Sequence, residues 1–566
     1  MREKDFYTIG VDFGTLSARA VLANIRDGTV AASSAFDYPH GVITGCLPDS
    51  PIPLPPSAAL ADVSDYRLAL KTVLRDAVLA GRAAGIRPEQ IIALGLDATS
   101  STFLPLGRDG LPLYEASLRP HPHAWMKLWK HHGAQAAADD LTRLARERRE
   151  PFLLRTGGKI NAEWMLPKLL EIFREDPEVW QATDRFMEIG DYLVMLLTGC
   201  RTAATGPLGY KMLFSAGEPS VTAEYLAAAE PGFETALEKI AGEKERRAPG
   251  DIAGFLTAEA AEELGLPAGI PVAAANIDAH VAYPTLGAVP EHSMLLILGT
   301  SCCTILPARE SRPVEGVFGI VRDGVLPGLY GYESGQSAVG DVLSWFVNRL
   351  TPEAYAREAA ASGKTLHELL TEKAAGLRPG ESGLLALDWL NGNRSVLMDT
   401  ELTGMILGLT LRTAPEEIYR ALIEALVFGL REIIESYERA GVPVRELFGT
   451  GGVARKNALF LQILADVTGR RIRVARAAEG SALGSAIFAA ACAGPDRGGY
   501  TDIFAAARAM GGCGEQVYKP NEANREVYDA LYQEYHRLHE TFGRGENAVM
   551  KRLLALREHS LRKEKT

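Results

Sequence analysis

The sequence predicts an α/β protein of two similar domains, each a mixed sheet flanked by helices, with a cleft between them. Its 566 residues are too many for one hydrophobic core. A strand, a Gly-Thr turn and another strand open both halves, at Gly14-Thr15-Leu16-Ser17 and at Gly299-Thr300-Ser301. Repetition of such a pattern indicates an internal duplication.

The first half begins with a hairpin and continues with helix–strand units. Apolar runs predict strands, and apolar residues at helical spacing predict helices. The predicted strands cover 6–11, 17–25, 29–38 and 91–97, the predicted helices cover 65–85, 163–174, 184–198 and 223–247, and a Gly/Pro loop is predicted at 205–211. Antiparallel strands followed by helix–strand units favour a mixed sheet, and an opening hairpin disfavours a dinucleotide-binding domain.

The second half repeats this alternation up to about residue 495, and a charged helical tail follows. The predicted strands cover 294–298, 302–306 and 471–475, the predicted helices cover 339–350, 415–440, 456–468, 478–493 and 521–566, and a glycine-punctuated loop is predicted at 330–335. These patterns divide the chain into domains at 1–288 and 289–495 and a helical appendage at 496–566.

The composition is that of an ordinary globular protein, 47% hydrophobic and 23% charged, with a net charge of -11. This charge argues against non-specific nucleic-acid binding, which needs an excess of Lys and Arg. No apolar run reaches membrane-spanning length, and no secretory signal is visible. Six cysteines without regular spacing indicate reduced thiols. We therefore expect a cytoplasmic protein with no nucleic-acid or membrane partner.

A stretch rich in histidine and tryptophan lies at 120–132. Its four histidines invite a zinc hypothesis, but no cysteine or close carboxylate completes a ligand set. Aromatic and basic residues lining a sugar pocket are one alternative, and plain surface and core placement is the other. The sequence favours these alternatives over a metal site.

The polar stretch 275–280 follows an apolar run near the middle of the chain. Asp278 therefore stands at the end of a buried strand, where α/β proteins place reacting groups. An Asp in front of a helix also serves as a helix cap. The local pattern leaves both interpretations open.

Three glycine turns each follow a predicted strand: the two Gly-Thr turns and Gly449-Thr450-Gly451-Gly452. Glycine lets the backbone approach a ligand closely and Thr or Ser adds a hydroxyl, so such turns suit phosphate oxygens. Asp12, at the end of the first strand, is placed to hold Mg²⁺, which prefers one or two carboxylates plus phosphates. The sequence contains no P-loop motif.

Residues 11–19, Val-Asp-Phe-Gly-Thr-Leu-Ser-Ala-Arg, resemble the first phosphate motif of the sugar kinases in the actin/hexokinase/heat-shock ATPase superfamily. Residues 298–301 resemble the second phosphate motif, and 449–452 with Asn457 resemble the adenosine motif. The order and separation are similar to those of the FGGY carbohydrate kinases over nearly the whole chain. The resemblance implies two duplicated ribonuclease-H-like (actin-like ATPase) domains.

The resemblance also implies a role for each matching residue. Asp278 would be the general base, and with Ser100, Lys211 and Glu333 it would line a ketopentose site. Asp12 would hold Mg²⁺. The residues that would bind ATP are Gly14, Thr15, Ser17, Arg19, Gly299, Thr300, Ser301, Gly451, Gly452 and Asn457.

Residues 121–132 and 331–337 are similar to stretches of the family members that phosphorylate L-ribulose. This implies ATP-dependent formation of L-ribulose 5-phosphate in L-arabinose catabolism, and it is compatible with a homodimer. The chain departs from the family pattern at Ala275, where the base motif usually opens with Gly, and at 97–100. A kinase of xylulose or D-ribulose is one alternative. An actin-like ATPase without a sugar acceptor is another, disfavoured by the set Lys211, Asp278 and Glu333.

Overall fold

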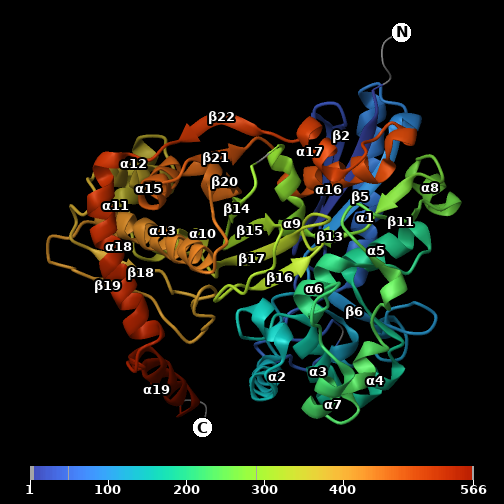
Figure 1. The fold of residues 1–566 in the computed structure, drawn as a ribbon, viewed down its shortest axis with the longest axis horizontal. Coiled ribbons are helices and arrows are strands. Elements are labelled where there is room, and N and C mark those ends of the chain that lie inside the picture. The colour runs from blue at the N-terminus through green and yellow to red at the C-terminus, as the bar shows by residue number, and fades with distance from the viewer. Residues whose placement is uncertain (1–4, 49, 289, 564–566) are drawn as a thin grey trace.

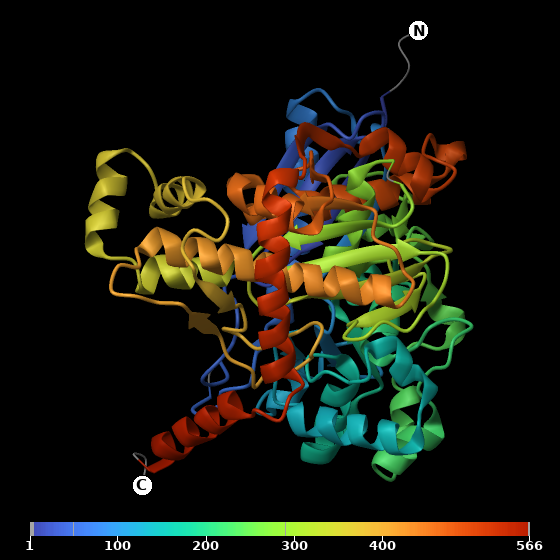
Figure 2. The same cartoon turned by 60° about the vertical axis from the view of Figure 1, so that its left-hand side comes forward.

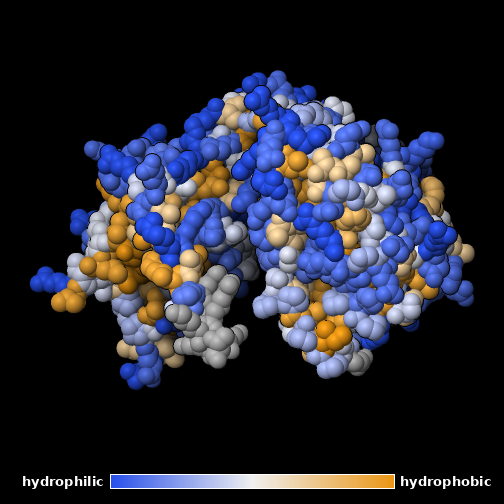
Figure 3. Space-filling model, turned by 90° about the horizontal axis from the view of Figure 1, so that it is seen from below, coloured by the Kyte–Doolittle hydropathy of each residue, from blue (hydrophilic) through white to orange (hydrophobic). Residues whose placement is uncertain are grey.

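Each half of the molecule is built on a mixed β-sheet, the first in blue and green and the second in yellow-green to red-orange in Figure 1. The computed structural model describes residues 5–48, 50–288 and 290–563. None of the helices in these ranges is long and apolar enough to cross a membrane. Seen from below, the surface is hollowed between the two halves (Figure 3).

The two sheets share one strand order. The first runs β11-β12-β5-β1-β2-β3 and the second β22-β21-β20-β14-β15-β17-β16. The first comprises β1 Tyr7–Phe13, β2 Ser17–Asn24, β3 Val30–Asp37, β5 Ile91–Ala98, β11 Ile252–Phe255 and β12 Pro271–Ala273, with β13 Asn276–Ile277 beside β5. The second comprises β14 Ser293–Leu298, β15 Cys302–Ala308, β16 Gly319–Arg322, β17 Tyr330–Gln336, β20 Glu446–Thr450, β21 Ile472–Ala475 and β22 Cys513–Tyr518.

The strand directions match as well. The central strands β1 and β14 each pair antiparallel with the next strand in the chain and parallel with a strand that follows a long helix. The outer pairs β5–β12 and β20–β21 are both parallel. This shared topology confirms the predicted fold class of two duplicated mixed α/β domains.

Helices flank both sheets. Those of the first half are α1 Val63–Ala83, α2 Gln135–Arg148, α3 Met165–Glu175, α4 Pro177–Ala182, α5 Ile189–Thr198, α6 Thr205–Met212, α7 Ala223–Ala229, α8 Ala258–Leu264 and α9 Asp278–Val281. Those of the second half are α10 Gly340–Arg349, α11 Glu353–Ala361, α12 Leu366–Ala375, α13 Pro415–Arg439, α14 Gly452–Lys456, α15 Ala458–Thr468, α16 Gly480–Ala493 and α17 Ile503–Met510. Short strands β4 Leu60–Ala61, β6 Phe103–Leu106, β7 Met126–Lys127 and β8 Arg185–Glu188 form a further small sheet, and β18 Leu385–Leu387 pairs with β19 Met405–Leu407.

Helix α16 belongs to the second half but packs directly on the first sheet. A Cβ atom at Gly10 would lie 1.9 Å from the Ala482 carbonyl oxygen, and one at Gly95 would lie 2.1 Å from that of Ser485. Both positions therefore need glycine so that the helix can approach the sheet. Helix α16 thus joins the second half to the first sheet along β1 and β5.

Four predicted elements are wrong in whole or in part. The predicted helix 184–198 begins only at Ile189, because Arg185–Glu188 form strand β8, which pairs with β6. The predicted loop 205–211 is helix α6, because Pro207 lies in its first turn, where the missing N–H costs no hydrogen bond. The predicted loop 330–335 is strand β17, whose Gly331 is required because a Cβ there would lie 2.5 Å from the Tyr210 hydroxyl. The predicted helix 223–247 ends at Ala229, just before Pro231 and Gly232.

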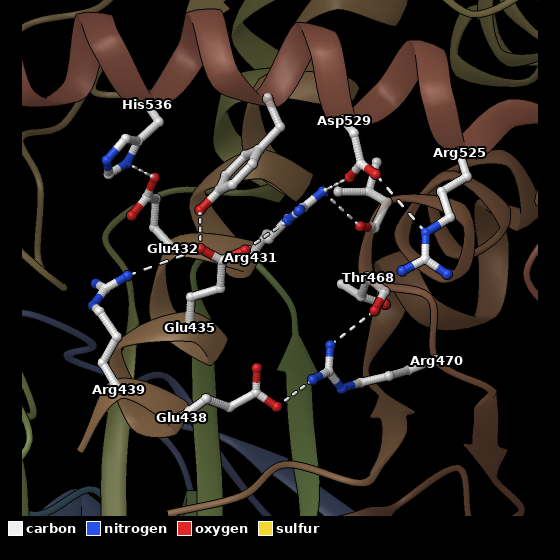
Figure 4. Close-up of polar contacts among 12 residues, drawn as sticks. Arg431, Glu432, Glu435, Glu438, Arg439, Thr468, Arg470, Arg525, Asp529 and His536 are labelled. Carbon is white, nitrogen blue, oxygen red and sulfur yellow. Dashed lines mark hydrogen bonds and ion pairs between the residues drawn. The ribbon is translucent and has the colours of Figure 1, made fainter. Parts of the chain in front are cut away.

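The charged tail forms helices α18 Glu522–Gly543 and α19 Val549–Lys563, and residues 564–566 of the predicted tail helix lie outside the described residues. Helix α18 packs along α13 through the contacts in Figure 4. Arg431 donates to Asp529 at 2.6 Å and lies 4.0 Å from the centre of the Tyr532 ring, while the His536 ring nitrogen lies 2.6 Å from Glu432. Helix α19 then extends away from the body (Figure 2).

Candidate active site

A cavity of about 290 Å³ lies between the two halves and is lined by residues of both. Eight of the predicted site residues line it: Thr15, Ser100, Lys211, Asp278, Gly299, Thr300, Ser301 and Glu333. The other predicted residues lie outside this lining: Asp12, Gly14, Ser17, Arg19, Gly451, Gly452 and Asn457. The structure therefore brings the predicted sugar residues and both Gly-Thr turns to one place.

Asp278 is the first residue of α9, directly after the short strand β13. The N-cap position is taken by Ile277, and the Asp278 carboxylate accepts one hydrogen bond, from the Ala279 amide at 2.8 Å. Its capping role is thus confined to the adjacent amide. Burial raises the pKa of Asp278 above its ordinary value. A carboxylate with so few protein donors and a raised pKa is suited to accept a proton from a ligand.

Three carboxyl groups converge beneath the cavity. Asp12 and Asp97 lie opposite each other on the paired strands β1 and β5, and β13 brings Asp278 to the same edge. Burial, followed by the charge of Asp278, raises the pKa of Asp12 to about 7. Burial and the neighbouring Asp12 raise the pKa of Asp97 well above its ordinary value. Such a cluster carries excess negative potential that a cation would relieve.

Asp97 is not among the predicted site residues, although it stands at the end of a buried strand, the same signal that singles out Asp278. Ser485 on α16 donates to its Oδ2 at 2.5 Å. Its Oδ1 atom is buried, and no donor from the described residues reaches it. An oxygen left this way is available to a bound ion or water.

Glu333 is the centre of a second polar group, on the opposite wall. Its Oε2 atom lies 3.2 Å from His280 Nε2 and 3.8 Å from Lys211 Nζ, and its Oε1 atom accepts from Arg394 at 3.3 Å. Burial alone would raise the pKa of Glu333, but Lys211, His280 and Arg394 outweigh it and hold this pKa below its ordinary value. Glu333 is therefore an ionised acceptor inside the cavity.

Lys211 and Glu333 come from different halves of the molecule. Lys211 stands in the last turn of α6, and the Tyr210 hydroxyl donates to the Gly331 carbonyl of β17 at 2.6 Å. This contact docks α6 against β17 and brings the two charged side chains together. Neither His280 nor Arg394 is among the predicted site residues: His280 lies in the polar stretch 275–280 without being assigned a role, and Arg394 lies outside every predicted motif.

The wall around Ser100 is joined to the first Gly-Thr turn by Trp129, whose indole N–H donates to Thr15 Oγ1 at 3.0 Å. Ser100 is buried and its hydroxyl has no partner among the described residues. Fully buried Lys168 donates to the carbonyls of Ser101 and Trp129 at 3.2 and 3.1 Å. Lys168 thereby holds the segments around Ser101 and Trp129 together in the cavity wall.

The histidine-rich stretch forms a packed polar network. His131 lies 3.0 Å from Glu171, which also pairs with Lys127 at 3.2 Å. Burial lowers the pKa of His131 to about 4. The described residues contain no group of three or more His, Cys, Asp or Glu arranged to hold a metal ion. Plain surface and core placement, with His131 buried and His132 exposed, therefore describes the stretch, apart from Trp129 in the cavity wall.

In both Gly-Thr turns the glycine amide closes the turn, onto a residue three positions further on in the first turn and two positions further on in the second. The Gly14 amide donates to the Ser17 carbonyl at 3.0 Å, and the Gly299 amide donates to the Ser301 carbonyl at 2.9 Å. The amides of Thr15 and Thr300, in contrast, donate to no backbone acceptor in the described part of the chain. Both turns therefore present a free N–H group, as anion-binding turns do.

The third glycine turn combines two different glycines. Gly451 has φ 93°, and a Cβ there would lie 2.5 Å from the Leu298 carbonyl oxygen, whereas a Cβ at Gly452 would have no atom within 4 Å. The fold therefore explains Gly451 and leaves Gly452 unexplained. Asn457 caps helix α15, accepting from the Phe460 amide at 3.0 Å.

The predicted nucleotide residue Arg19 is exposed and lies 3.9 Å from Glu479.

Both halves of the chain match one protein family. Residues 7–283 match the N-terminal domain and residues 294–493 the C-terminal domain of the FGGY family of carbohydrate kinases. The chain belongs to this family. Membership of a kinase family implies the use of ATP.

Curated relatives are similar over nearly the full length. The chain is 47% identical over 556 residues to a ribulokinase of Shouchella clausii, covering 98% of each chain. It is 43% identical over 560 residues to a ribulokinase of Mycolicibacterium smegmatis, covering 99% of this chain and 98% of that one. The sequence resemblance to this family is thereby confirmed.

Solved structures share the fold. A xylulose kinase from Rhodospirillum rubrum superposes with a TM-score of 0.77 at 25% identity, covering 94% of this chain and 98% of that one. A Plasmodium falciparum glycerol kinase with ADP superposes with a TM-score of 0.75 at 15% identity, over 94% and 98% of the two chains. At 15% identity the likeness concerns the fold alone.

Proposed function

We propose that this protein transfers the γ-phosphoryl group of ATP to the O5 hydroxyl of L-ribulose, forming L-ribulose 5-phosphate for L-arabinose catabolism. The observation that carries the proposal is one cavity in which Asp278 and the Lys211–Glu333 pair face two turns with free amides. The curated relatives with 43–47% identity that are named ribulokinase support the choice of sugar.

Asp278 is the proton acceptor of the reaction. A bond forms between the sugar oxygen and the γ-phosphorus, the bond from that phosphorus to the β-phosphate oxygen breaks, and the hydroxyl proton passes to the Asp278 carboxylate. The transition state is loose, so positioning and electrostatic stabilisation supply most of the catalysis, and a correctly placed base adds about 10²- to 10⁴-fold. The raised pKa of Asp278 makes it a better proton acceptor than an exposed aspartate.

Lys211, Glu333 and Ser100 hold the sugar. Ionised Glu333 accepts hydrogen bonds from sugar hydroxyls, and Lys211 donates to a sugar oxygen; both contacts are charge-assisted and stronger than neutral ones. The buried, unpartnered Ser100 hydroxyl offers a further contact. Because Lys211 and Glu333 come from different halves, bound sugar is contacted by both halves and shields the reacting atoms from water.

The free amides of Thr15 and Thr300 donate to phosphate oxygens of ATP. The Asp12 carboxyl and the unpartnered oxygen of Asp97 fit a Mg²⁺ ion, because a dication would offset the negative cluster that raises their pKa values. When bound, Mg²⁺ neutralises charge on the phosphates. We assign Arg19, Ser17 and the turn at Gly451 and Gly452, with Asn457, to the nucleotide on the family resemblance.

Replacing Asp12 with alanine is expected to shift the Mg²⁺ concentration for half-maximal activity upward by at least about tenfold, since even outer-shell partners of metal ligands contribute 10–100-fold. The measurement is a Mg²⁺ titration of activity at saturating sugar. Asp139→Ala, at an exposed position on α2, is the control. An unchanged Mg²⁺ titration of activity in Asp12→Ala would contradict a role for Asp12 in binding Mg²⁺.

Substitutions of the neighbouring glycines Gly451 and Gly452 separate a structural role from a role in ATP binding. Gly452→Ala is expected to keep the melting temperature of the wild type, because its Cβ meets no protein atom, and to raise the KM for ATP by about tenfold, or ~1.4 kcal/mol. Gly451→Ala is expected to lower the melting temperature, because its positive φ and the Leu298 carbonyl oppose a side chain. Thermal unfolding and ATP kinetics check both. An unchanged ATP KM in Gly452→Ala would exclude close approach of the nucleotide.

The sugar is tested by kcat/KM for L-ribulose, D-ribulose and the xyluloses in a coupled ADP-release assay. L-ribulose is expected to have the highest value. Preference for xylulose or D-ribulose would keep the kinase mechanism and correct the substrate. ADP release that is independent of any sugar would favour the actin-like ATPase alternative.

The homodimer and the domain boundaries at 288/289 and 495/496 are part of the proposal. Light scattering is expected to give twice the chain mass of 61.0 kDa. Strand β22 lies in the segment assigned to the helical appendage, yet it pairs with β21 of the second sheet. Truncation of the chain after residue 495 would therefore remove an edge strand as well as the tail.

A further inference from the structure

Arg394 lines the cavity, although no motif in the sequence points to it. It stands in the loop between β18 and β19 and lies beside Glu333. Its guanidinium lies 4.2 Å from the centre of the Phe318 ring, a stacking contact that fixes the plane of the group. Lys211 Nζ lies 5.3 Å from the same ring. The side chains of Arg394 and Lys211 therefore both lie near the Phe318 ring at the cavity wall.

Most of the hydrogen-bonding capacity of Arg394 is unused. A guanidinium has five N–H donors. Among the residues that the structure describes, Glu333 alone accepts from it, at 3.3 Å, and its buried Nε atom has no partner. Buried donors are normally satisfied, so donors left open at the wall of a cavity indicate a ligand oxygen.

Arg394 and the helix that carries Asp278 contact different oxygens of Glu333. His280 of α9 lies 3.2 Å from the Oε2 atom, whereas Arg394 donates to the Oε1 atom at 3.3 Å. Arg394 and α9 therefore approach a bound ligand from different sides of Glu333.

The loop that carries Arg394 is held from several sides. Ser395 accepts from the Gly335 amide of β17 at 3.2 Å, and Lys159 of the first half donates to the Met398 carbonyl at 2.9 Å. Lys551 on α19 pairs with Asp399 at 2.5 Å. This support restricts the guanidinium to one place, which lowers the entropy cost of using it for recognition.

The C-terminal helices take part in this support beyond α19. The Tyr535 hydroxyl on α18 donates to Asp388 at the start of the loop at 2.7 Å, and Gln336 at the end of β17 donates to the other Asp388 oxygen at 2.9 Å. The same tail therefore braces both β17, which carries Glu333, and the loop, which carries Arg394. The residues beyond 493, which lie outside the family match, thus contribute to the geometry of the cavity.

We propose that Arg394 is a substrate-binding residue that donates to the carbonyl end of the ketopentose, away from the hydroxyl that receives the phosphoryl group. This inference rests on the proposed function. Together with Glu333 and Lys211, Arg394 distinguishes a sugar with a carbonyl oxygen acceptor from one without it. The contact is made equally in the ground state and the transition state, because the atoms it touches do not react.

The test is the sugar affinity and the kinetics of Arg394→Met, which keeps an apolar stem on Phe318 and removes all donors. The dissociation constant and KM for L-ribulose are expected to rise by about 10- to 100-fold, the range for a hydrogen bond to a charged group. The KM for ATP and kcat are expected to stay within about twofold, since uniform binding affects KM alone. Arg394→Lys is expected to lie between the wild type and Arg394→Met.

The control is Arg357→Met on α11, where the arginine is 72% exposed and pairs with Glu353 at 3.4 Å. It is expected to leave both KM values unchanged. Titration calorimetry with L-ribulose in the absence of ATP keeps the result independent of turnover, and thermal unfolding shows whether each variant is folded.

The outcomes separate the two proposals. If the wild type binds and phosphorylates L-ribulose while folded Arg394→Met has unchanged sugar affinity, the role of Arg394 is overturned and the function stands. If the wild type prefers another pentulose and Arg394→Met weakens its binding, the substrate is corrected and the role of Arg394 stands. Equal rises in the sugar and ATP KM values, or a wild type that binds no pentulose, would overturn the role of Arg394.

Discussion

Asp278→Asn is expected to lower kcat by about 10²- to 10⁴-fold, the usual contribution of a general base. The substitution removes the proton acceptor and almost no volume, and an asparagine oxygen can still accept from the Ala279 amide. The KM values for ATP and sugar should therefore stay close to those of the wild type. Steady-state kinetics with each substrate varied separately measure both quantities.

The pH dependence of kcat/KM gives a second test of Asp278. A base works only when deprotonated, so activity falls as the pH drops through its pKa. Because burial raises the pKa of Asp278, the acidic limb of kcat/KM should lie above the range of an ordinary aspartate, which is about pH 3.9. The limb due to Asp278 is the one that Asp278→Asn abolishes.

Asp139→Asn, at an exposed position on α2, is the matched control and should retain wild-type kinetics. A kcat of Asp278→Asn close to that of the wild type would contradict the assignment of Asp278 as the general base. A large rise in the sugar KM with unchanged kcat would instead make Asp278 a binding residue.

Lys211→Ala is expected to raise the KM for L-ribulose by about 10- to 100-fold, because a charge-assisted hydrogen bond to the sugar is lost. The KM for ATP should change by less than about threefold, since Lys211 pairs with Glu333 and is assigned to the sugar. Kinetics on both substrates check this. Exposed Lys244→Ala is the control, and equal shifts in the two KM values would place Lys211 elsewhere.

Lys211→Ala should also change the stability in a pH-dependent way. The pKa of Glu333 is held below its ordinary value, so its stabilising effect is present above the unfolded-state pKa, about 4.3, and is lost as the pH falls further. The melting temperature of Lys211→Ala should therefore lie below that of the wild type at pH 7. The difference should narrow below about pH 4, and a constant difference would contradict the pairing.

The duplication is predictable because its signal is local. Each half contains a strand, a Gly-Thr turn and a second strand, and in both turns the glycine amide donates to a serine carbonyl two or three residues further on. The end of the buried strand at Asp278 carries a local signal too. Asp97 carries the same signal and could have been selected by the same argument.

Other parts of the site depend on contacts between distant segments. Gly331 suggests a loop, but it is required by the approach of Tyr210 from α6, which no local pattern reveals. Arg394 lies in an irregular loop without periodicity, and its partner Glu333 is 61 residues away in the chain. The sequence predicts a loop at Lys211 because Gly and Pro surround it, yet Pro207 falls in the tolerated first turn of a helix.

Phosphorus NMR of the wild type with ATP, Mg²⁺ and L-ribulose tests the central claim most directly. The account predicts one new sugar monophosphate, esterified at O5, for each ADP formed, and loss of that signal at matched times with Asp278→Asn. ADP accompanied by inorganic phosphate and no sugar ester would contradict it, as would full ester formation by Asp278→Asn.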